Sequence, residues 1–435
     1  MNRTLSLMLY KSICNVYHCA RSDIFVFART VCSASRTCID SHSDEFGTSQ
    51  HPVFRPKRAA IIPRITRYEF EKKRYKNKDN EELKLILEQK RSDYQVLLAR
   101  HEKHYKSVEI MRQSLEKNKI ETKVFSRLEF TEDLLNWADV IFAAGGDGTF
   151  LLTASKIRQI HKPVIGINTD PKRSEGCLCL PKDKYSAANF DATLQRLFAG
   201  NFRWKWKQRI RIIMSGLHNN DEPIELHDQQ LQYLEHRYNE HIQEFQNCHE
   251  PHNLPRTTEI PRILPVLALN DVFVGESLSS RVSYYEMSID DGPASKQKSS
   301  GVTVCTGTGS TSWYFHINHI TNEAVRDILS IANRKSGMQL PLDYRFLSEV
   351  RKQYNSSLKF DPSEKRMAFT VRDPLINGVF QVPNPRGFAN KIQIRSRMWD
   401  ACLVVDGGSS FRFNDGAVAT LEIHDEDALR TVMFD

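Results

Sequence analysis

Three patterns are missing from this sequence, and each absence excludes a class of protein. No stretch of the 435 residues reaches the roughly 18 consecutive apolar residues of a membrane-spanning helix, so no membrane insertion is predicted. The nine cysteines include no C-x-x-C pair, which argues against a zinc site or a disulfide framework. The net charge of +8 is not gathered in a basic stretch with stacking aromatic residues, so nucleic acid is not an expected partner.

Acidic residues are also scarce near the N-terminus. Before Asp40 the only acid is Asp23, whereas basic residues recur and serines are frequent. Apolar residues are scattered there, without the compact h-region of a secretory signal. This composition is typical of a mitochondrial transit peptide over residues 1–57, with a disordered tail as the alternative. The reduced thiols that would remain after its removal fit the mitochondrial matrix.

The rest of the chain is long enough for two domains with cores of their own. Residues 58–200 alternate apolar strand candidates with helical stretches, which predicts an α/β domain whose parallel sheet is covered by helices. Within it, a capping-box pattern at Asp79 and Glu82 predicts one long helix from about residue 80 to 101 or beyond. The strand candidates are residues 59–63, 137–142 and 163–168.

Residues 201–406 have a different pattern, because short alternating segments of period two replace the helices and predict a β-rich domain. A polar insertion at about 218–262 interrupts it. An amphipathic helix is predicted at 227–246, packing either on its own domain or on a second subunit. Its apolar positions are Leu231, Leu234, Tyr238, Ile242 and Phe245.

A glycine-rich turn, GGDGT, follows the buried strand at 137–142 and precedes a helix at 150–157. A strand, a glycine turn and a helix N-terminus together form a phosphate-binding cradle. Asp147 is the one ionisable group inside it, and we interpret it as catalytic or metal-binding; the alternative is a plain turn with Asp147 as a helix cap. The turn lacks the lysine of a Walker A loop. The cradle residues are Gly145, Gly146, Gly148 and Thr149.

Charged residues also follow two other predicted strands. Arg64 and Arg67 come just after residues 59–63, and they either face the phosphate crevice or belong to a solvated turn. Asp170 follows residues 163–168, either at the ligand-binding edge of the sheet or in an ordinary Asp-Pro turn.

Two further patterns lie in the β-rich half. Asn270 and Asp271 interrupt an apolar strand, so one of them is expected to be buried and to contact a ligand, with a bulge as the alternative. A second glycine turn at 305–313 offers hydroxyl donors and an aromatic face for a purine. Its candidate residues are Thr308, Gly309, Ser310, Thr311 and Trp313.

The order GGDGT, then Asn-acid within a strand, then T-G-T-G-S-T-x-W resembles the NAD kinase family over residues 58–435, most closely its mitochondrial branch. Lipid kinases of the diacylglycerol and sphingosine type share only the first motif. The resemblance implies an α/β domain, a β-rich domain that binds NAD, and a C-terminal segment at about 407–435 that returns to the first domain. It also implies a homodimer.

The resemblance further implies an assignment of roles. Asp147 would be the general base for the 2′-hydroxyl of the adenosine ribose of NAD, while Asn270 and Asp271 would hold NAD. Residues 311–316 would lie near the adenine, and Arg281 would be a further basic contact. The chain departs from the family at Asp271, where Glu is usual, and at Trp313, where Tyr is usual; residues 298–301 also lack the usual Arg-x-Asp-Gly.

The expected reaction is transfer of the γ-phosphoryl group from ATP to NAD, forming NADP, with Mg²⁺ bound to ATP and with inorganic polyphosphate as an alternative donor. Phosphoryl transfer depends mainly on positioning and charge stabilisation, which suits a glycine cradle. The alternatives are a lipid kinase and a catalytically silent nucleotide sensor.

Overall fold

The computed structural model describes residues 53–434 except 127, 128, 130, 233–257, 379 and 381–383. The predicted transit peptide therefore lies outside the described residues apart from its last few positions, and so does the predicted helix beyond residue 232. Within the described ranges, no helix has the length and apolar character needed to cross a membrane.

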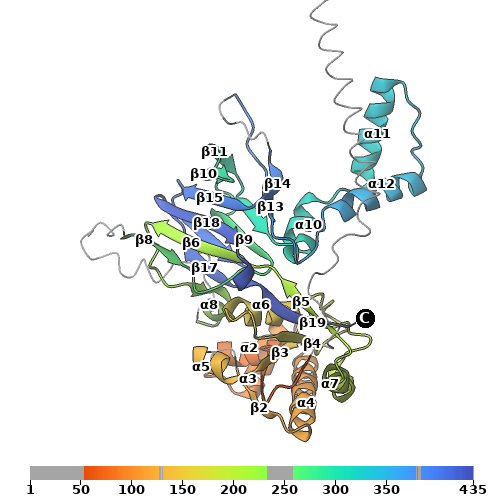
Figure 1. Ribbon diagram of the computed structural model, residues 1–435, viewed down its shortest axis with the longest axis vertical. Helices are drawn as coiled ribbons and strands as arrows, with labels where there is room; N and C mark the ends of the chain where they lie inside the picture. Colours follow the sequence, from red (N-terminus) through yellow and green to blue (C-terminus); the bar gives the residue numbers. More distant parts are fainter. Residues whose placement is uncertain are drawn as a thin grey trace, which may run out of the picture. The chain divides into compact units, whose positions relative to one another are not determined.

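A four-stranded parallel sheet forms the centre of the first domain (Figure 1). Alternate residues of its strands enter two different cores: Ile61 and Phe142 pack on one face, and Ile62 and Ile141 pack on the other. A strand buried on both faces needs apolar residues at every position, which explains its continuous apolar runs. In sheet order the strands are β2 (Glu121–Val124), β1 (Arg58–Pro63), β3 (Val140–Gly145) and β4 (Val164–Asn168).

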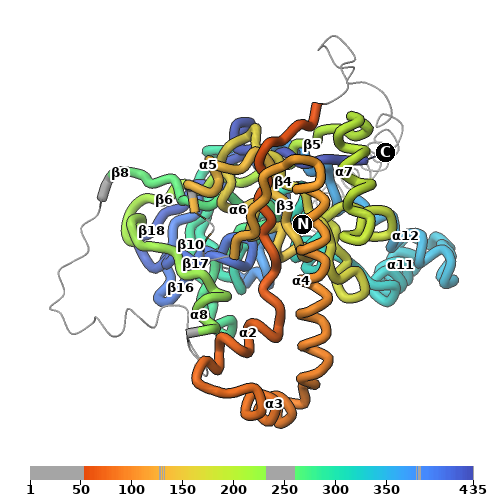
Figure 2. The backbone as a smooth tube through the Cα atoms, turned by 90° about the horizontal axis from the view of Figure 1, so that it is seen from below, coloured from red at the N-terminus to blue at the C-terminus, as the bar shows by residue number. Residues whose placement is uncertain are grey.

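Helices cover both faces of this sheet. The apolar sides of α4 and α7 pack on one face, and those of α5 and α6 pack on the other. Figure 2 shows α4 running past β3 and β4, with α3 at its far end. The helices are α2 (Arg67–Arg74), α3 (Asn80–Gln89), α4 (Tyr94–Lys117), α5 (Glu132–Trp137), α6 (Asp147–Lys156) and α7 (Phe190–Phe198).

The single long helix predicted from residue 80 is wrong, because the structure divides it into α3 and α4. The capping box at Asp79 and Glu82 is present and begins α3. Arg91 then adopts a left-handed conformation with φ of 56°, and Asp93 accepts a hydrogen bond from the N–H of Val96 at 3.0 Å. A second N-cap thus begins a new helix where apolar periodicity alone indicated continuation.

The second domain is a sandwich of two antiparallel sheets around an apolar core, so the predicted fold class is confirmed. The six-stranded sheet runs β11 (Ser295–Ser299), β10 (Ser283–Ile289), β15 (Lys391–Ser396), β18 (Ala417–Ile423), β6 (Ile210–Gly216), β8 (Thr258–Ile263). The seven-stranded sheet runs β14 (Arg386–Ala389), β13 (Met367–Val371), β12 (Val302–Cys305), β9 (Asp271–Glu276), β16 (Ala401–Val405), β17 (Ser409–Arg412), β7 (Ile224–Glu225).

The remaining described elements are a separate two-stranded sheet, several helices and short 3-10 turns. Figure 1 shows α11 and α12 side by side, away from the parallel sheet. These elements are β5 (Arg203–Lys207), α8 (Leu226–Gln232), α10 (Trp313–Asn318), α11 (Asn322–Ser336), α12 (Tyr344–Ser357) and β19 (Leu429–Met433), with short 3-10 turns at Ala187–Asn189, Gly309–Thr311 and Asp425–Asp427.

The chain end returns to the first domain later than residue 407. β19 pairs with β5, and Val432 enters the core of the parallel sheet. Residues 409–423, in contrast, form β17 and β18 of the sandwich. The alternating pattern of Ala417, Ala419 and Leu421 explains this difference, since these side chains face the sandwich core.

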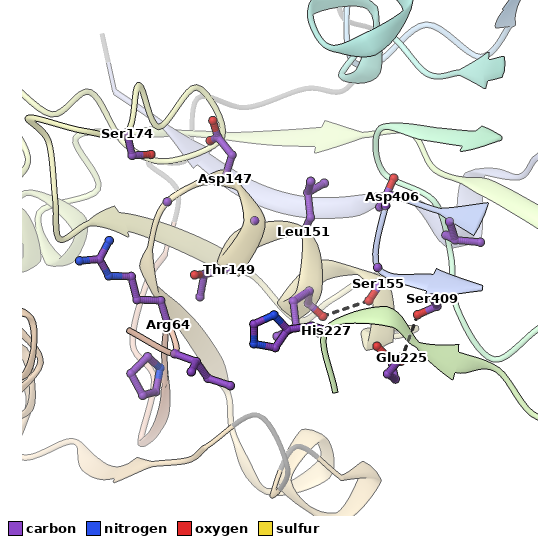
Figure 3. A pocket seen from close by; sticks show the side chains of 18 residues that line it. Arg64, Asp147, Thr149, Leu151, Ser155, Ser174, Glu225, His227, Asp406 and Ser409 are labelled. Atoms are coloured by element: carbon purple, nitrogen blue, oxygen red, sulfur yellow. Dashed lines mark hydrogen bonds between the residues drawn. The ribbon is translucent and has the colours of Figure 1, made fainter. Parts of the chain in front are cut away.

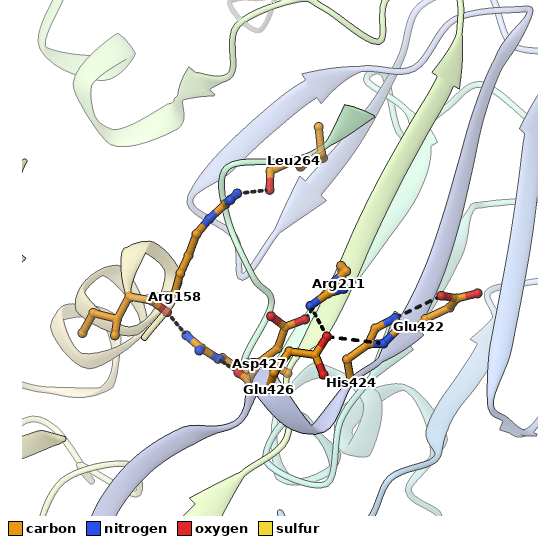
Figure 4. Close-up of polar contacts among 9 residues, drawn as sticks. Arg158, Arg211, Leu264, Glu422, His424, Glu426 and Asp427 are labelled. Carbon is orange, nitrogen blue, oxygen red and sulfur yellow. Dashed lines mark hydrogen bonds and ion pairs between the residues drawn. The ribbon is translucent and has the colours of Figure 1, made fainter. Parts of the chain in front are cut away.

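A buried arginine joins the two domains where the chain returns. Arg209 is fully buried and donates to the carbonyl oxygens of Ala154 (2.8 Å), Ile157 (2.5 Å) and Asp427 (2.5 Å). Burial lowers the pKa of its guanidinium to about 10. Figure 4 shows the neighbouring pairs, in which Arg211 binds the carboxylate of Asp427 at 2.6 Å. These hydrogen bonds connect the end of α6 to the 3-10 turn at Asp425–Asp427.

Arg209→Met is expected to lower the free energy of unfolding by about 2–4 kcal/mol, because three buried carbonyls lose their donor. Urea denaturation followed by circular dichroism measures this loss. Arg211→Met is the matched control, and it should cost less because the Arg211 side chain is partly exposed and one of its two partners, Glu426, lies at the surface, although the other, Asp427, is buried. Equal losses in the two variants would contradict the role assigned to Arg209.

Candidate functional site

A cavity of about 500 Å³ opens at the carboxyl edge of the parallel sheet (Figure 3). The chain leaves β1 toward β2 and leaves β3 toward β4, on the opposite side, so the ends of β1 and β3 form the topological switch point at which open α/β sheets bind ligands. The lining residues include Arg64, Gly146, Asp147, Gly148, Thr149, Ser155, Ser174, Glu225, His227, Asp406, Gly407, Gly408 and Ser409.

Asp147 is the first residue of α6, and Gly146 is the N-cap. The interpretation of Asp147 as a helix cap is therefore wrong. Its carboxylate accepts hydrogen bonds from the backbone N–H groups of Leu178 (2.7 Å) and Cys177 (3.2 Å). These bonds hold the carboxylate at the cavity wall, beside the N-terminus of a ten-residue helix.

The glycines of this turn differ in what a side chain there would meet. A Cβ at Gly145 would lie 2.7 Å from the Cβ of Thr149, so a side chain does not fit there. A Cβ at Gly148 would meet no atom within 4 Å, and this residue is exposed at the cavity. The turn therefore leaves open space in front of the helix N-terminus, where an anion is favoured.

Arg64 supplies a positive charge at the cavity, which agrees with the interpretation that it faces the phosphate crevice. Its guanidinium pairs with Asp170 at 3.2 Å, so Asp170 orients it from the end of β4. Arg67 instead pairs with Glu71 and lies over the ring of Phe70. Among the described lining residues, Arg64 is the one arginine or lysine.

Two buried basic groups lie behind this wall. The Nδ1 of His104 is 3.0 Å from the Thr169 hydroxyl, and burial, with the charge of Arg64, lowers the pKa of His104 to about 4. Lys207 is about nine-tenths buried with its ammonium 5.3 Å from the centre of the Phe150 ring, and burial lowers its pKa to about 8. His104 is thus neutral at physiological pH.

Asp406 organises the segment that contains Asn270 and Asp271. Its carboxylate accepts backbone hydrogen bonds from Leu269 (2.8 Å), Asn270 (2.8 Å) and Asp271 (3.0 Å). Burial raises the pKa of Asp406 to about 6, and burial together with the charge of Asp406 raises the pKa of Asp271 to about 7. β9 begins at Asp271, so the prediction that Asn270 and Asp271 both lie within one strand is wrong for Asn270. The register of β9 with both neighbours is unbroken, so the bulge interpretation is wrong as well.

The second glycine turn packs directly on Asn270. The N–H of Thr306 donates to the Asn270 carbonyl at 3.0 Å, and the Asn270 amide donates to the Ser312 hydroxyl at 3.2 Å. A Cβ at Gly309 would collide with the Asn270 carbonyl. The structure thus brings these two sequence motifs together.

The hydroxyls of Ser310 and Thr311 are used within this turn, whereas that of Thr308 has no hydrogen-bond partner among the described residues. Ser310 donates to the carbonyl of Gly307 at 2.6 Å, and Thr311 donates to that of Thr308 at 3.2 Å. The Thr308 side chain is buried. These residues therefore shape the turn in this structure.

Trp313 and Arg281 lie away from the cavity lining. The Trp313 ring contacts Phe273, with 5.2 Å between ring centroids, and the guanidinium of Arg372 lies 4.9 Å from its centre. Arg281 follows the far end of β9 and pairs with Glu276 at 3.9 Å. At about 3.3 Å per residue, its partner Glu276 lies roughly 17 Å along the strand from Asp271.

Sequence analysis did not identify several cavity residues. Asp406 could have been identified from the sequence, since an Asp-Gly-Gly turn follows an apolar strand there. Glu225, His227 and Ser409 lie in no sequence pattern that indicates a site. The described residues contain no group of three or more His, Cys, Asp or Glu side chains arranged for a metal ion. Asp147, Glu225 and Asp406 nevertheless line one cavity, although the carboxylate of Asp406 already accepts three backbone N–H groups. Mg²⁺ commonly uses one or two carboxylates with substrate phosphates and water.

Comparisons with known proteins identify related chains. A family model described as the ATP-NAD kinase N-terminal domain matches residues 57–201. Mitochondrial NAD kinase 2 of Homo sapiens is 48% identical over 384 residues, covering 88% of this chain and 85% of the relative. That of Xenopus tropicalis is 45% identical over 402 residues, covering 88% and 92%. A crystal structure of an NAD kinase from Archaeoglobus fulgidus in complex with ATP has a TM-score of 0.46 and 17% identity, covering 87% of this chain and 93% of that one.

Proposed function

The chain belongs to the NAD kinase family, and we propose that it transfers the γ-phosphoryl group of ATP to the 2′-hydroxyl of the adenosine ribose of NAD. The resemblance found in the sequence is thereby confirmed at the level of the family. The relatives do not favour a lipid kinase or a silent nucleotide sensor.

The observation that carries the proposal is the position of Asp147. Its carboxylate lies at the wall of the switch-point cavity, beside a helix N-terminus and opposite open space at Gly148. We assign Asp147 as the general base that accepts the proton of the attacking 2′-hydroxyl. The helix N-terminus and Arg64 would hold the donor phosphates, so that base and phosphoryl group converge in one cavity.

Other residues would bind the acceptor. Asn270 and Asp271 are assigned to NAD, since both are buried at the start of β9 and the Asn270 Oδ1 has no hydrogen-bond partner among the described residues. Gly309 would let the second glycine turn approach NAD closely, as it already lets this turn approach the carbonyl of Asn270. Trp313 is assigned to the adenine and Arg281 to a charged group of NAD on the basis of the resemblance.

Further features of the proposal come from the resemblance and from the names of the relatives. Mg²⁺ bound with ATP would neutralise charge on the β- and γ-phosphate oxygens, with Asp147 or Glu225 as oxygen ligands. Inorganic polyphosphate is an alternative donor. We also propose a homodimer, and a mitochondrial location in the matrix after removal of a transit peptide within residues 1–57.

The test is a coupled assay on the full chain. Mg-ATP and NAD are supplied, and NADP is measured with an NADP-specific dehydrogenase; polyphosphate replaces ATP in a second arm. We expect NADP to form, and diacylglycerol or sphingosine offered as acceptor should remain unmodified. A folded protein that makes no NADP with either donor would rule out the proposal.

A further inference from the structure

The described part of the insertion joins the C-terminal sandwich to the cavity. β7 is a short strand of two residues that extends the seven-stranded sheet by pairing with β17, with Glu225 opposite Ser409. The Ser409 hydroxyl donates to the Glu225 carboxylate at 3.0 Å, and the N–H of Leu226 donates to the carbonyl of Gly408 at 2.9 Å. The start of α8 is therefore held against the Asp-Gly-Gly turn that follows β16.

The other side of this segment contacts the first domain. The imidazole of His227 packs on the ring of Phe70 in α2, with 5.1 Å between ring centroids and 48° between planes. His227 also lines the cavity, and Figure 3 shows its ring among Arg64, Thr149 and Ser155. The insertion thus spans the cavity from the sandwich to α2, and His227 is the group that it contributes at the middle.

The charges of the cavity show what such a group can do. The acidic residues among the described lining residues are Asp147, Glu225 and Asp406, and their carboxylates accept hydrogen bonds from protein donors. Arg64 is the one arginine or lysine among the described lining residues. Carboxylates suit ribose hydroxyls and metal ions, but they repel phosphate oxygens. A nucleotide with a phosphate chain needs further N–H donors, and an imidazole N–H is such a donor.

Resting on the proposed function, we propose that His227 is a nucleotide-binding residue that donates a hydrogen bond to a phosphate oxygen of the bound nucleotide, opposite the N-terminus of α6. Phosphate ester oxygens occur in both ATP and NAD, so the chemistry recognised is the same and either nucleotide could supply it. Phe70 would then act as the support that orients the imidazole.

The test compares His227→Ala, His227→Gln and Gln230→Ala in the full chain. Gln230 is exposed on the same helix and does not line the cavity, so its variant is the matched control. Loss of one hydrogen bond to a charged oxygen corresponds to about a tenfold loss of affinity. We expect His227→Ala to raise the KM for ATP or for NAD about tenfold, with kcat within about threefold of the parent. His227→Gln retains an N–H donor and should recover most of this loss of affinity.

The KM values for ATP and for NAD are measured separately, and they identify the ligand. A rise in the KM for ATP assigns the contact to the donor phosphates, and a rise in the KM for NAD assigns it to the pyrophosphate. Equilibrium binding of ADP and of adenosine gives a readout without turnover: His227→Ala should weaken ADP and leave adenosine unchanged, or, if NAD is the ligand, weaken NAD. Unchanged binding of ADP and NAD, or a His227→Gln variant as weak as His227→Ala, would overturn the proposal. A parent that binds these nucleotides but makes no NADP would instead refute the proposed function.

Discussion

Asp147→Asn is expected to lower kcat for NADP formation by about 10²–10⁴-fold, the usual contribution of a general base. An amide cannot accept the proton of the 2′-hydroxyl. Its oxygen can still accept the N–H of Leu178, which is 2.7 Å from the carboxylate in the parent, and only the longer bond from Cys177, at 3.2 Å, is lost. The variant should therefore fold normally and bind ATP and NAD. Initial rates with Mg-ATP and NAD, together with nucleotide binding, measure the two effects separately.

The matched control is Asp139→Asn. Asp139 precedes β3, as Asp147 follows it, and its carboxylate also accepts two consecutive backbone N–H groups, those of Lys57 (2.8 Å) and Arg58 (2.9 Å), both at Oδ2. It lies at the opposite end of the strand, away from the cavity. We expect activity close to that of the parent. If the two variants lost activity equally, the loss would come from the backbone bonds, and Asp147 would not be the base.

Asp271→Asn is expected to stabilise the protein above neutral pH while weakening its binding of NAD. Burial and the charge of Asp406 raise the pKa of Asp271 from 3.8 to about 7. Between these values the folded state binds more protons than the unfolded state, so the free energy of unfolding falls as pH rises through this window. At 1.36 kcal/mol per pKa unit, the free energy of unfolding is lower at pH 8 than below the unfolded-state pKa by at most about 4 kcal/mol. The amide of Asp271→Asn does not titrate, so the variant does not lose this stability.

The measurement is urea denaturation of parent and variant at pH 5 and pH 8, combined with the KM for NAD. The gain in stability should be larger at pH 8, and the KM should rise about tenfold because a charged acceptor of ribose hydroxyls is lost. Asp290→Asn is the control, since this exposed carboxylate accepts the N–H groups of Asn390 and Lys391 in the same domain. A variant destabilised equally at both pH values would contradict the raised pKa.

These predictions differ in how far they depend on the tertiary structure. Asp147 was identified from the local pattern alone, because a buried strand, glycines and a helix start are consecutive in sequence. The same holds for the alternation that places Ile61 and Ile62 in different cores. The division of α3 from α4 shows the limit of such patterns, since apolar periodicity continues across Asp93 whereas the backbone does not.

What the sequence by itself determined was the family, the two-domain fold class and the GGDGT cradle, because each depends on residues that are neighbours along the chain. Only the tertiary structure decided that Arg64 rather than Arg67 faces the cavity, that Asp406 holds the backbone of Asn270 from 136 positions away, and that His227 reaches the site from the insertion. Such contacts are set by the packing of distant elements. No local periodicity records them, so their residues carry no pattern that a single sequence could reveal.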